Sequence, residues 1–333
     1  MIFTAHAHAR AGLVGNPSDG YFGKTISYII RNFRATVRLW ETPHFEIVPT
    51  HGDFARFDSV ESYLRDQKLY GYYGGMRLMK AAVRRFHDYC ATEGRELHKR
   101  NFTVSYESDI PRIVGLSGSG AIVVATLRAL MQFYEVELPR HYLPTLALSV
   151  ERDELGLTAG LQDRVIQVCE GIVYMDFDRE LIQRRGYGDY EDLRPPKMPP
   201  FYIAYDPARS EVSDVPHRNL RELYNRGDKA VVQAMQEFRD LTDRGRAALM
   251  GCNWGELGRI IDENFDLRVR IMSIAPENLR MVESARAVGA SAHFCGSGGS
   301  ITGLYRDGKH YQEIVDALGA IRCTVFRPII FEA

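Results

Sequence analysis

A short run of small residues is the part of this sequence whose composition and position best suit a binding site. It reads Gly115-Leu116-Ser117-Gly118-Ser119-Gly120 and separates a stretch with strand-like alternation from a long helical pattern. Small residues let successive backbone N–H groups turn toward one point, and the start of a helix adds partial positive charge. The run therefore predicts a phosphate-binding loop. The alternative is a tight strand-to-helix turn that binds nothing.

Two other nucleotide-binding motifs are not matched. The spacing of Gly115, Gly118 and Gly120 differs from the G-x-G-x-x-G pattern of dinucleotide-binding folds. Gly23-Lys24-Thr25 ends like a P-loop, but Ser18 stands where that motif begins with glycine. The spacing thus argues against hydride transfer and against a P-loop enzyme.

Two acidic residues follow the loop, Glu151 and, twelve positions later, Asp163. Phosphoryl transfer to a hydroxyl needs a magnesium ligand and often a carboxylate that accepts the hydroxyl proton. Glu151 and Asp163 are candidates for these two roles. The alternative is that Glu151, Asp153 and Glu154 form a solvated helix end.

Three separated motifs resemble those of the GHMP kinases, the superfamily of galactokinase, mevalonate kinase and homoserine kinase. They are Arg10–Gly15 (RAGLVG), the loop at Gly115, and Gly289-Ala290-Ser291 leading to Cys295–Gly299 (CGSGG). Their order and separation fit, and the resemblance spans nearly the whole chain. It implies an α+β fold of two domains, a ribosomal-protein-S5-like first domain and a ferredoxin-like second domain, with ATP as co-substrate and Mg²⁺ as the metal.

The same resemblance implies roles for individual residues. The loop from Gly115 to Gly120 would bind the ATP phosphates, and its Ser119 would also hold magnesium. Glu151 would be the second magnesium ligand, and Asp163 would be the catalytic base. Arg10 matches an arginine beside the reacting groups, where a fixed cation can lower the pKa of the hydroxyl and stabilise transferred charge.

A closer resemblance, to the plant-type glucuronokinases, narrows the substrate. It rests on stretches from both halves of the chain: RAGLVGNPSDGYFGKTIS at 10–27, GLQDRVIQV at 160–168, YMDF at 174–177 and NFDLR at 264–268. That family makes glucuronic acid 1-phosphate from glucuronic acid and ATP. Galacturonate, a neutral hexose or a heptose phosphate are alternative substrates, and a non-catalytic regulator on the same fold is the alternative class.

The substrate-site candidates are Asp19, Lys24, Asn264, Arg268 and Gly298. A substrate carboxylate needs a local partner because the net charge of the protein is only -1, and the planar fork of arginine suits it best. Asn264 and Arg268 lie four residues apart in a helical pattern and so share a face. We expect Arg268 to bind the carboxylate, with Lys24 as the next candidate. Alternatively, Arg268 pairs with Asp262 or Asp266 on a solvated helix.

Alternating and helical patterns indicate the elements that must position these residues. Strands are expected at 2–14, 102–106 and 201–205, and a hairpin is expected from 35–40 and 44–48. Helices are expected at 62–65, 72–90, 121–133 and 139–153, and the second half is expected to be helical to Val288. A strand, a glycine turn and another strand should surround Gly296.

The prolines at 195, 196, 199 and 200 predict an interdomain linker, which gives domains at 1–194 and 201–333. Forty-two basic residues nearly balance forty-three acidic ones, so we expect no nucleic-acid partner and no anionic membrane surface. No apolar run is long enough to span a membrane. Five scattered cysteines suit a reducing cytoplasm. The partners expected are a sugar acid and ATP, and the oligomeric state is left open.

Overall fold

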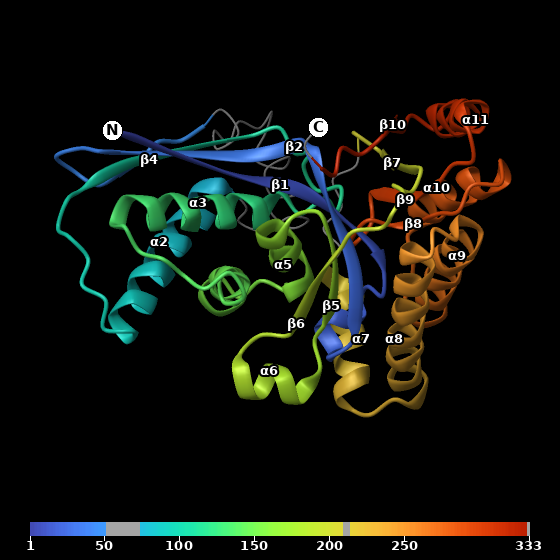
Figure 1. The fold of residues 1–333 in the computed structure, drawn as a ribbon, viewed down its shortest axis with the longest axis horizontal. Coiled ribbons are helices and arrows are strands. Elements are labelled where there is room, and N and C mark those ends of the chain that lie inside the picture. The colour runs from blue at the N-terminus through green and yellow to red at the C-terminus, as the bar shows by residue number, and fades with distance from the viewer. Residues whose placement is uncertain (51–73, 209–213, 332–333) are drawn as a thin grey trace, which may run out of the picture. The chain divides into compact units, whose positions relative to one another are not determined.

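The computed structural model describes residues 1–50, 74–208 and 214–331. These residues form two compact units, each assembled from separate parts of the chain (Figure 1). Unit 1 contains Met1–Ala9, Phe33–Ile110 and Ser117–Val168, and unit 2 contains Arg10–Asn32, Pro111–Leu116 and Cys169–Ala333. The predicted domain boundary between 194 and 201 stays a prediction.

Two long strands, β1 (Ile2–Val14) and β2 (Lys24–Glu41), pair with each other and contribute residues to both units. In unit 1, β2 pairs antiparallel with β4 (Phe102–Ser108), from Ala35 opposite Ser108 to Glu41 opposite Phe102. The helices of unit 1 are α2 (Gly75–Thr92), α3 (Gly118–Tyr134), α4 (Leu143–Ser149) and α5 (Leu161–Cys169). Helices α2 and α3 pack together and cover one face of these strands (Figure 1).

The hairpin predicted at 35–48 is wrong. Residues 35–40 belong to β2, but β3 (Glu46–Ile47) pairs in parallel with β4 rather than with β2. The physical reason is that β4 already occupies that edge of β2 along its whole length in unit 1, so the short strand lies on the far edge of β4.

Unit 2 contains two sets of paired strands. In the first, β2 is followed by β5 (Ile172–Asp176) and β6 (Asp189–Leu193), and both pairings are antiparallel. The second is a four-stranded sheet in the order β10-β7-β9-β8, made of β7 (Phe201–Tyr205), β8 (His293–Phe294), β9 (Ser300–Leu304) and β10 (Thr324–Phe326).

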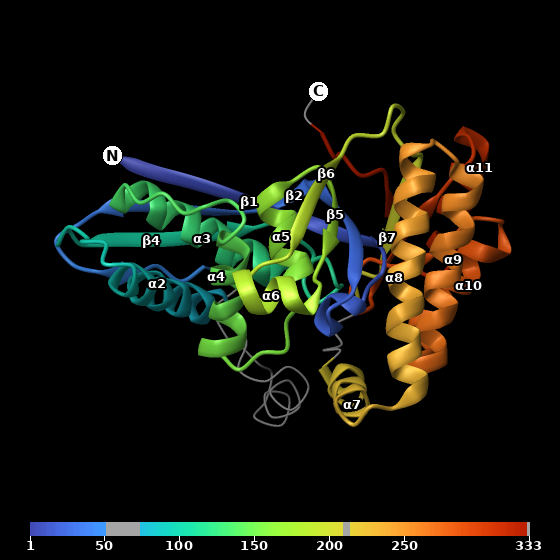
Figure 2. The same cartoon turned by 60° about the horizontal axis from the view of Figure 1, so that its bottom comes forward.

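Within the described residues, five helices connect the strands of this sheet in the sequence. Between β7 and β8 come α7 (Asp214–Asn225), α8 (Lys229–Met250), α9 (Trp254–Ile271) and α10 (Pro276–Ala287), and between β9 and β10 comes α11 (Gly308–Gly319). Helix α6 (Arg179–Arg185) joins β5 to β6. Helices α8 and α9 run side by side in both views (Figures 1 and 2). The resulting β-α-β-β-α-β order is that of ferredoxin-like folds, as predicted for the second half.

The core of this sheet explains why its helices lie where they do. Phe265 of α9, Val282 of α10 and Ile314 of α11 pack with Phe294 and Ile301 of the strands in one buried cluster. Each helix therefore presents an apolar face to the sheet, as periodic burial requires.

Most of the other predicted elements are confirmed within one or two residues or with longer bounds. The strands predicted at 2–14 and 201–205 coincide with β1 and β7. The helix predicted at 139–153 begins later, because residues 139–142 form a turn, and after Ser149 it continues as a wider π turn to Glu154. The predicted helix at 62–65 and residues 72–73 lie outside the described residues. None of the helices in the described ranges combines the length and apolar character that crossing a membrane requires.

Candidate active site

The predicted phosphate loop contains the start of α3 in unit 1. Ser117 is the residue before the helix, with φ 61° and ψ 47°, and its carbonyl accepts a hydrogen bond from the N–H of Ala121 at 3.1 Å. The next three N–H groups, of Gly118, Ser119 and Gly120, belong to the first turn, where a helix offers no acceptor of its own. Since α3 is 17 residues long, these N–H groups lie at the positive end of a full helix dipole.

The first part of the loop belongs to unit 2, where it is held by Arg10 near the end of β1. The Arg10 guanidinium is buried and donates from Nη1 to the carbonyls of Gly115, at 2.6 Å, and Cys295, at 2.8 Å. The backbone N–H of Arg10 donates to the carbonyl of Leu116 at 3.2 Å. One side chain thus joins the first and last motifs, Arg10–Gly15 and Cys295–Gly299, to the middle one.

Gly115 has to be glycine for both conformation and space. Its φ is +73°, and an added Cβ would lie 2.6 Å from the carbonyl oxygen of Gly298. The glycine turn between β8 and β9 therefore lies directly against the Gly115 backbone. Gly298, predicted to contact the substrate, has this neighbour on one side and Asn278 on the other.

Two acidic residues of unit 1, the predicted magnesium ligand Glu151 and the predicted base Asp163, share one basic neighbour. Glu151, in the turn after α4, is buried and forms an ion pair with Arg164, which is also buried. Arg164 lies 3.6 Å from the carboxylate of Asp163, on the first turn of α5. Glu151 is therefore not part of a solvated helix end, whereas its neighbour Asp153 is exposed and pairs with Arg152.

The donors predicted for magnesium can be tested against this geometry. A hydroxyl and a carboxylate are hard oxygen donors of the kind Mg²⁺ takes, usually one or two carboxylates together with substrate phosphates. In the described part of the chain no three His, Cys, Asp or Glu side chains gather around a common point. Ser119 and Glu151 fit the ion by donor type, on the condition that Arg164 releases Glu151.

Arg268 of α9, in unit 2, is the largest fully buried side chain of the described residues. It lies over the ring of Phe294, 5.1 Å from its centre, and donates from Nη1 to the carbonyl of Gly296 at 2.8 Å. Its Nε is buried and has no hydrogen-bond partner among the described residues. Burial lowers the pKa of Arg268 to about 10, against the effect of Asp19 and with a further contribution from Arg10.

The predicted alternative for Arg268 is not observed. Asp262 and Asp266 pair with Arg286 of α10, at 3.0 Å and 2.7 Å, and not with Arg268. No ion pair joins Arg268 to any carboxylate within the ranges that the structure describes. The helix face that carries it is buried rather than solvated.

Asn264, one turn before Arg268, is fully buried in a polar cluster that holds the loop after β1. Its Oδ1 accepts the N–H of Gly15 at 2.7 Å, and its Nδ2 lies 3.0 Å from Nε2 of His293. His293 Nε2 also lies 2.5 Å from Oδ1 of Asn16. These contacts give Asn264 a positioning role, and a direct contact with substrate stays a prediction.

Burial, followed by the charges of Arg268 and Arg286, holds the pKa of His293 well below its ordinary value of 6.5. The imidazole is therefore neutral at pH 7, and its Nε2 atom either donates to Oδ1 of Asn16 or accepts from Nδ2 of Asn264, according to the tautomer. It adds no further positive charge beside Arg268.

Lys24, at the start of β2, is surrounded by acids of unit 2. Its Nζ lies 2.9 Å from Asp243 and 3.6 Å from Asp176. Partial burial opposes the charge, but hydrogen bonds with Tyr174 and Asp243 raise the pKa of Lys24 above its ordinary value. A cation already matched by two carboxylates is a poor partner for a third. A substrate role for Lys24 stays a prediction without support from this geometry.

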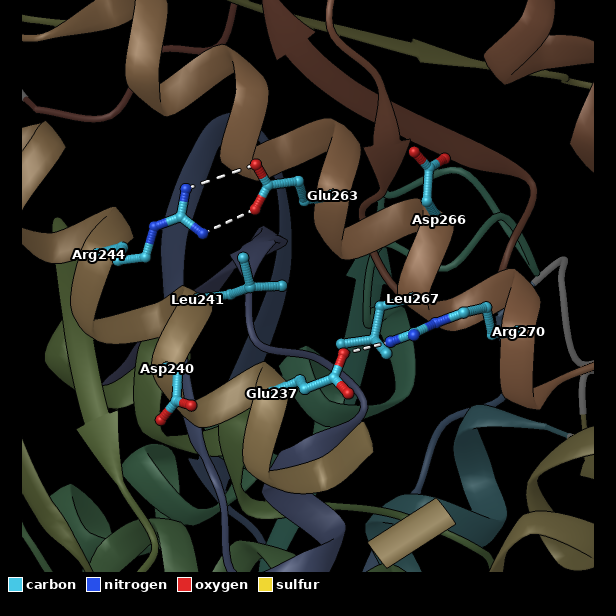
Figure 3. Close-up of a pocket in the computed structure, with 8 residues that line it drawn as sticks. All are labelled: Glu237, Asp240, Leu241, Arg244, Glu263, Asp266, Leu267 and Arg270. Atoms are coloured by element: carbon cyan, nitrogen blue, oxygen red, sulfur yellow. Dashed lines mark hydrogen bonds and ion pairs between the residues drawn. The ribbon is translucent and has the colours of Figure 1, made fainter. Parts of the chain in front are cut away.

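A groove of about 470 Å³ lies between α8 and α9 (Figure 3). Its walls combine Leu241 and Leu267 with charged side chains, among which Arg244 pairs with Glu263 and Arg270 with Glu237. None of the predicted site residues lines it. We therefore assign the groove no part in the candidate site.

Two residues of α5 were missed as functional candidates. Arg164 directly follows the predicted base, and Gln167 follows it by four positions, so the helical period from Asp163 was the available signal for Gln167. For Arg164 the signal was its place in the GLQDR motif, although no pattern indicated a pairing with Glu151.

Comparisons with known proteins identify relatives of this chain. Residues 77–171 match the family model of the GHMP kinases N terminal domain, and GHMP kinases use ATP. The chain is 39% identical to probable glucuronokinase 2 of Arabidopsis thaliana over 95% of this chain and 87% of that protein. It is also 39% identical to glucuronokinase 1 of the same plant, over 92% and 86% of the two chains.

The fold comparison extends the likeness to solved structures. The phosphomevalonate kinase of Streptococcus pneumoniae superposes with a TM-score of 0.76, covering 99% of this chain and all of that one at 14% identity. Such low identity supports the fold alone. The resemblance predicted from the three motifs is confirmed by the relatives and by the α+β architecture. The chain belongs to the GHMP kinases and, within them, to the glucuronokinase family.

Proposed function

We propose that this chain transfers the γ-phosphoryl group of ATP to the anomeric hydroxyl of glucuronic acid, which yields glucuronic acid 1-phosphate and ADP. Membership of the glucuronokinase family supports the reaction. The single structural observation that carries the substrate assignment is the buried guanidinium of Arg268, which has no carboxylate partner among the described residues.

A buried arginine without an ion-pair partner is costly, because burial penalises the charged form and a hydrogen-bonded anion offsets most of that penalty. The lowered pKa of Arg268 expresses this cost. A uronic acid carries the missing anion. Its carboxylate, accepting from the free Nε and the adjacent Nη, would complete a bidentate pair that a neutral hexose cannot form. Arg268 therefore selects an acidic sugar in this proposal.

In the transfer step, the anomeric oxygen attacks the γ-phosphorus while the bond from that phosphorus to the β,γ-bridging oxygen breaks. The proton of the hydroxyl passes to the carboxylate of Asp163, and ADP leaves with the bridging oxygen. Because phosphoryl transfer needs little covalent help from the protein, positioning and charge stabilisation supply most of the rate. The N–H groups of Gly118–Gly120 bind the phosphates, and Arg10 supplies a fixed positive charge.

Magnesium, held by Ser119 and Glu151 in this proposal, would neutralise charge on the phosphates when bound. Arg164 has a different role, which is to balance the charge of neighbouring carboxylates. It compensates the buried Glu151 carboxylate through an ion pair, and it also lies 3.6 Å from the carboxylate of Asp163.

A substrate panel that measures ADP release tests the proposal. Glucuronate, galacturonate, glucose, galactose and a heptose phosphate are offered to the same enzyme at equal concentrations. The proposal predicts that glucuronate has the highest kcat/KM. Preference for a neutral hexose would overturn the glucuronate assignment, and absence of ADP release with every sugar would favour a non-catalytic protein on the kinase fold.

A further inference from the structure

Gln167 of α5 makes contacts that the proposed reaction does not yet use. Its side chain is fully buried (0% exposed) in unit 1. The amide Nε2 donates to the carbonyl of Ser117 at 2.8 Å and to the carbonyl of His8, in β1, at 3.2 Å. One side chain therefore joins the phosphate loop to a strand and to the helix that carries Asp163.

The loop needs this support because of its backbone conformation. Ser117 has a positive φ of 61°, a left-handed conformation that is unfavourable for a residue other than glycine. Its side chain makes no capping hydrogen bond to the helix. The carbonyl of Ser117, shared by the N–H of Ala121 and the amide of Gln167, is thus the group through which the turn is held.

The other end of the Gln167 amide faces the same loop. Its Oε1 and the hydroxyl of Ser117 are both buried without a hydrogen-bond partner among the described residues. A Cβ added to Gly120 would lie 2.6 Å from this Oε1 and 2.8 Å from the Ser117 hydroxyl. The glycine at 120 and the glutamine at 167 are therefore matched, since any side chain at 120 would displace the amide.

Helix α5 is itself firmly placed. Arg128 of α3 donates to the carbonyls of Gln167, at 3.1 Å, and Val168, at 3.2 Å, and to that of His6 at 2.6 Å. These bonds use carbonyls at the C-terminal end of α5 that lack helical partners. Because Asp163 lies one turn before Gln167, the predicted base and Gln167 share one face of the helix.

We propose that Gln167 is a positioning residue for the phosphate loop. It holds Ser117 in the left-handed conformation, so that the N–H groups of Gly118–Gly120 face the ATP phosphates, and it fixes this loop relative to the helix of the catalytic base. The inference rests on the proposed kinase function, and it concerns the ATP side of the reaction only.

The first test is Gln167→Met, which keeps the length of the side chain and removes both donated hydrogen bonds. ATP affinity is measured by calorimetry, and KM is measured separately for ATP and for glucuronate. With about 1 kcal/mol lost per hydrogen bond, ATP binding should weaken about five- to thirtyfold, whereas the glucuronate KM stays within twofold. The matched control is Thr126→Val, which removes a buried hydrogen bond to Ile122 within α3 and should leave ATP affinity unchanged.

The second test is a double-mutant cycle with Gly120→Ala and Gln167→Ala. The alanine at 120 should weaken ATP binding by displacing the amide, and the double variant should bind ATP no more weakly than the worse single variant. Effects that multiply would overturn the proposal, as would Gln167→Met with a lowered Tm but wild-type ATP affinity. Absence of ATP binding by the wild-type protein would instead refute the kinase function itself.

Discussion

Replacing Arg268 with methionine removes the buried charge and keeps a long, flexible side chain at a position that is only 1% exposed. A hydrogen bond to a charged group is worth roughly 1.5–3 kcal/mol, so the KM for glucuronate should rise about ten- to hundredfold. The KM for glucose, which has no carboxylate, and the KM for ATP should each change less than about twofold. Initial rates of ADP release with the three substrates measure all of these values.

The effect on stability distinguishes this role from a structural one. A pKa lowered from 12.5 to about 10 means that folding disfavours the charged form of Arg268 by on the order of 3 kcal/mol. Removing the charge relieves that penalty and offsets the lost contacts with Gly296 and Phe294. We therefore expect the Tm of Arg268→Met without ligand to equal or exceed that of the wild type.

Arg286 provides the matched control, since it belongs to the same unit but is paired with Asp262 and Asp266. Arg286→Met should lower the Tm and leave the glucuronate KM unchanged. The reasoning is refuted if Arg268→Met keeps the wild-type glucuronate KM, or if it raises the KM for glucose by the same factor.

Three further predictions concern other polar groups of the chain. Asp163→Asn should bind ATP normally by calorimetry but turn over on the order of a hundredfold more slowly, since general-base catalysis contributes about that much; near-normal turnover would exclude Asp163 as the base. Glu151→Ala removes one half of the buried ion pair with Arg164 and should lower the free energy of unfolding by up to about 3–5 kcal/mol in urea titrations, whereas Glu151→Gln should mainly raise the magnesium concentration required for activity. The pKa of His293 is lower in the folded than in the unfolded chain, so below pH 6.5 the unfolded chain binds a proton that the folded chain does not. The free energy of unfolding should therefore fall with decreasing pH by up to about 1.4 kcal/mol per pH unit. His293→Gln should reduce this slope, and an unchanged slope would contradict the neutral buried imidazole.

Sequence patterns predicted those strands and helices in which the spacing of apolar residues shows which face is buried. Strand β1 alternates along its first residues, and α3 is a continuous apolar helix that follows a glycine loop. The partner of β3 could not be predicted, because strand pairing depends on which edge a distant segment occupies. The nine residues of α5 were too few to give a clear helical signal between two loops.

The sequence indicated which residues are candidates for the site, but it did not indicate which side chains they contact. Arg268 was expected to bind an anion from its residue type and helix face, but only the structure shows that Asp262 and Asp266 are taken by Arg286. The pairing of Glu151 with Arg164 likewise joins two segments whose separation no local pattern spans. Such partners are set by tertiary packing, where desolvation decides which charges must meet.

The phosphorylated product gives the most direct test of the proposed reaction. After the enzyme has acted on glucuronate and ATP, the position of the new phosphate is identified by phosphorus–proton coupling in NMR spectra. The account predicts one phosphate ester, at the anomeric carbon, formed in equal amount to ADP. A phosphate on any other hydroxyl, or ADP formed without a phosphorylated uronate, would contradict it.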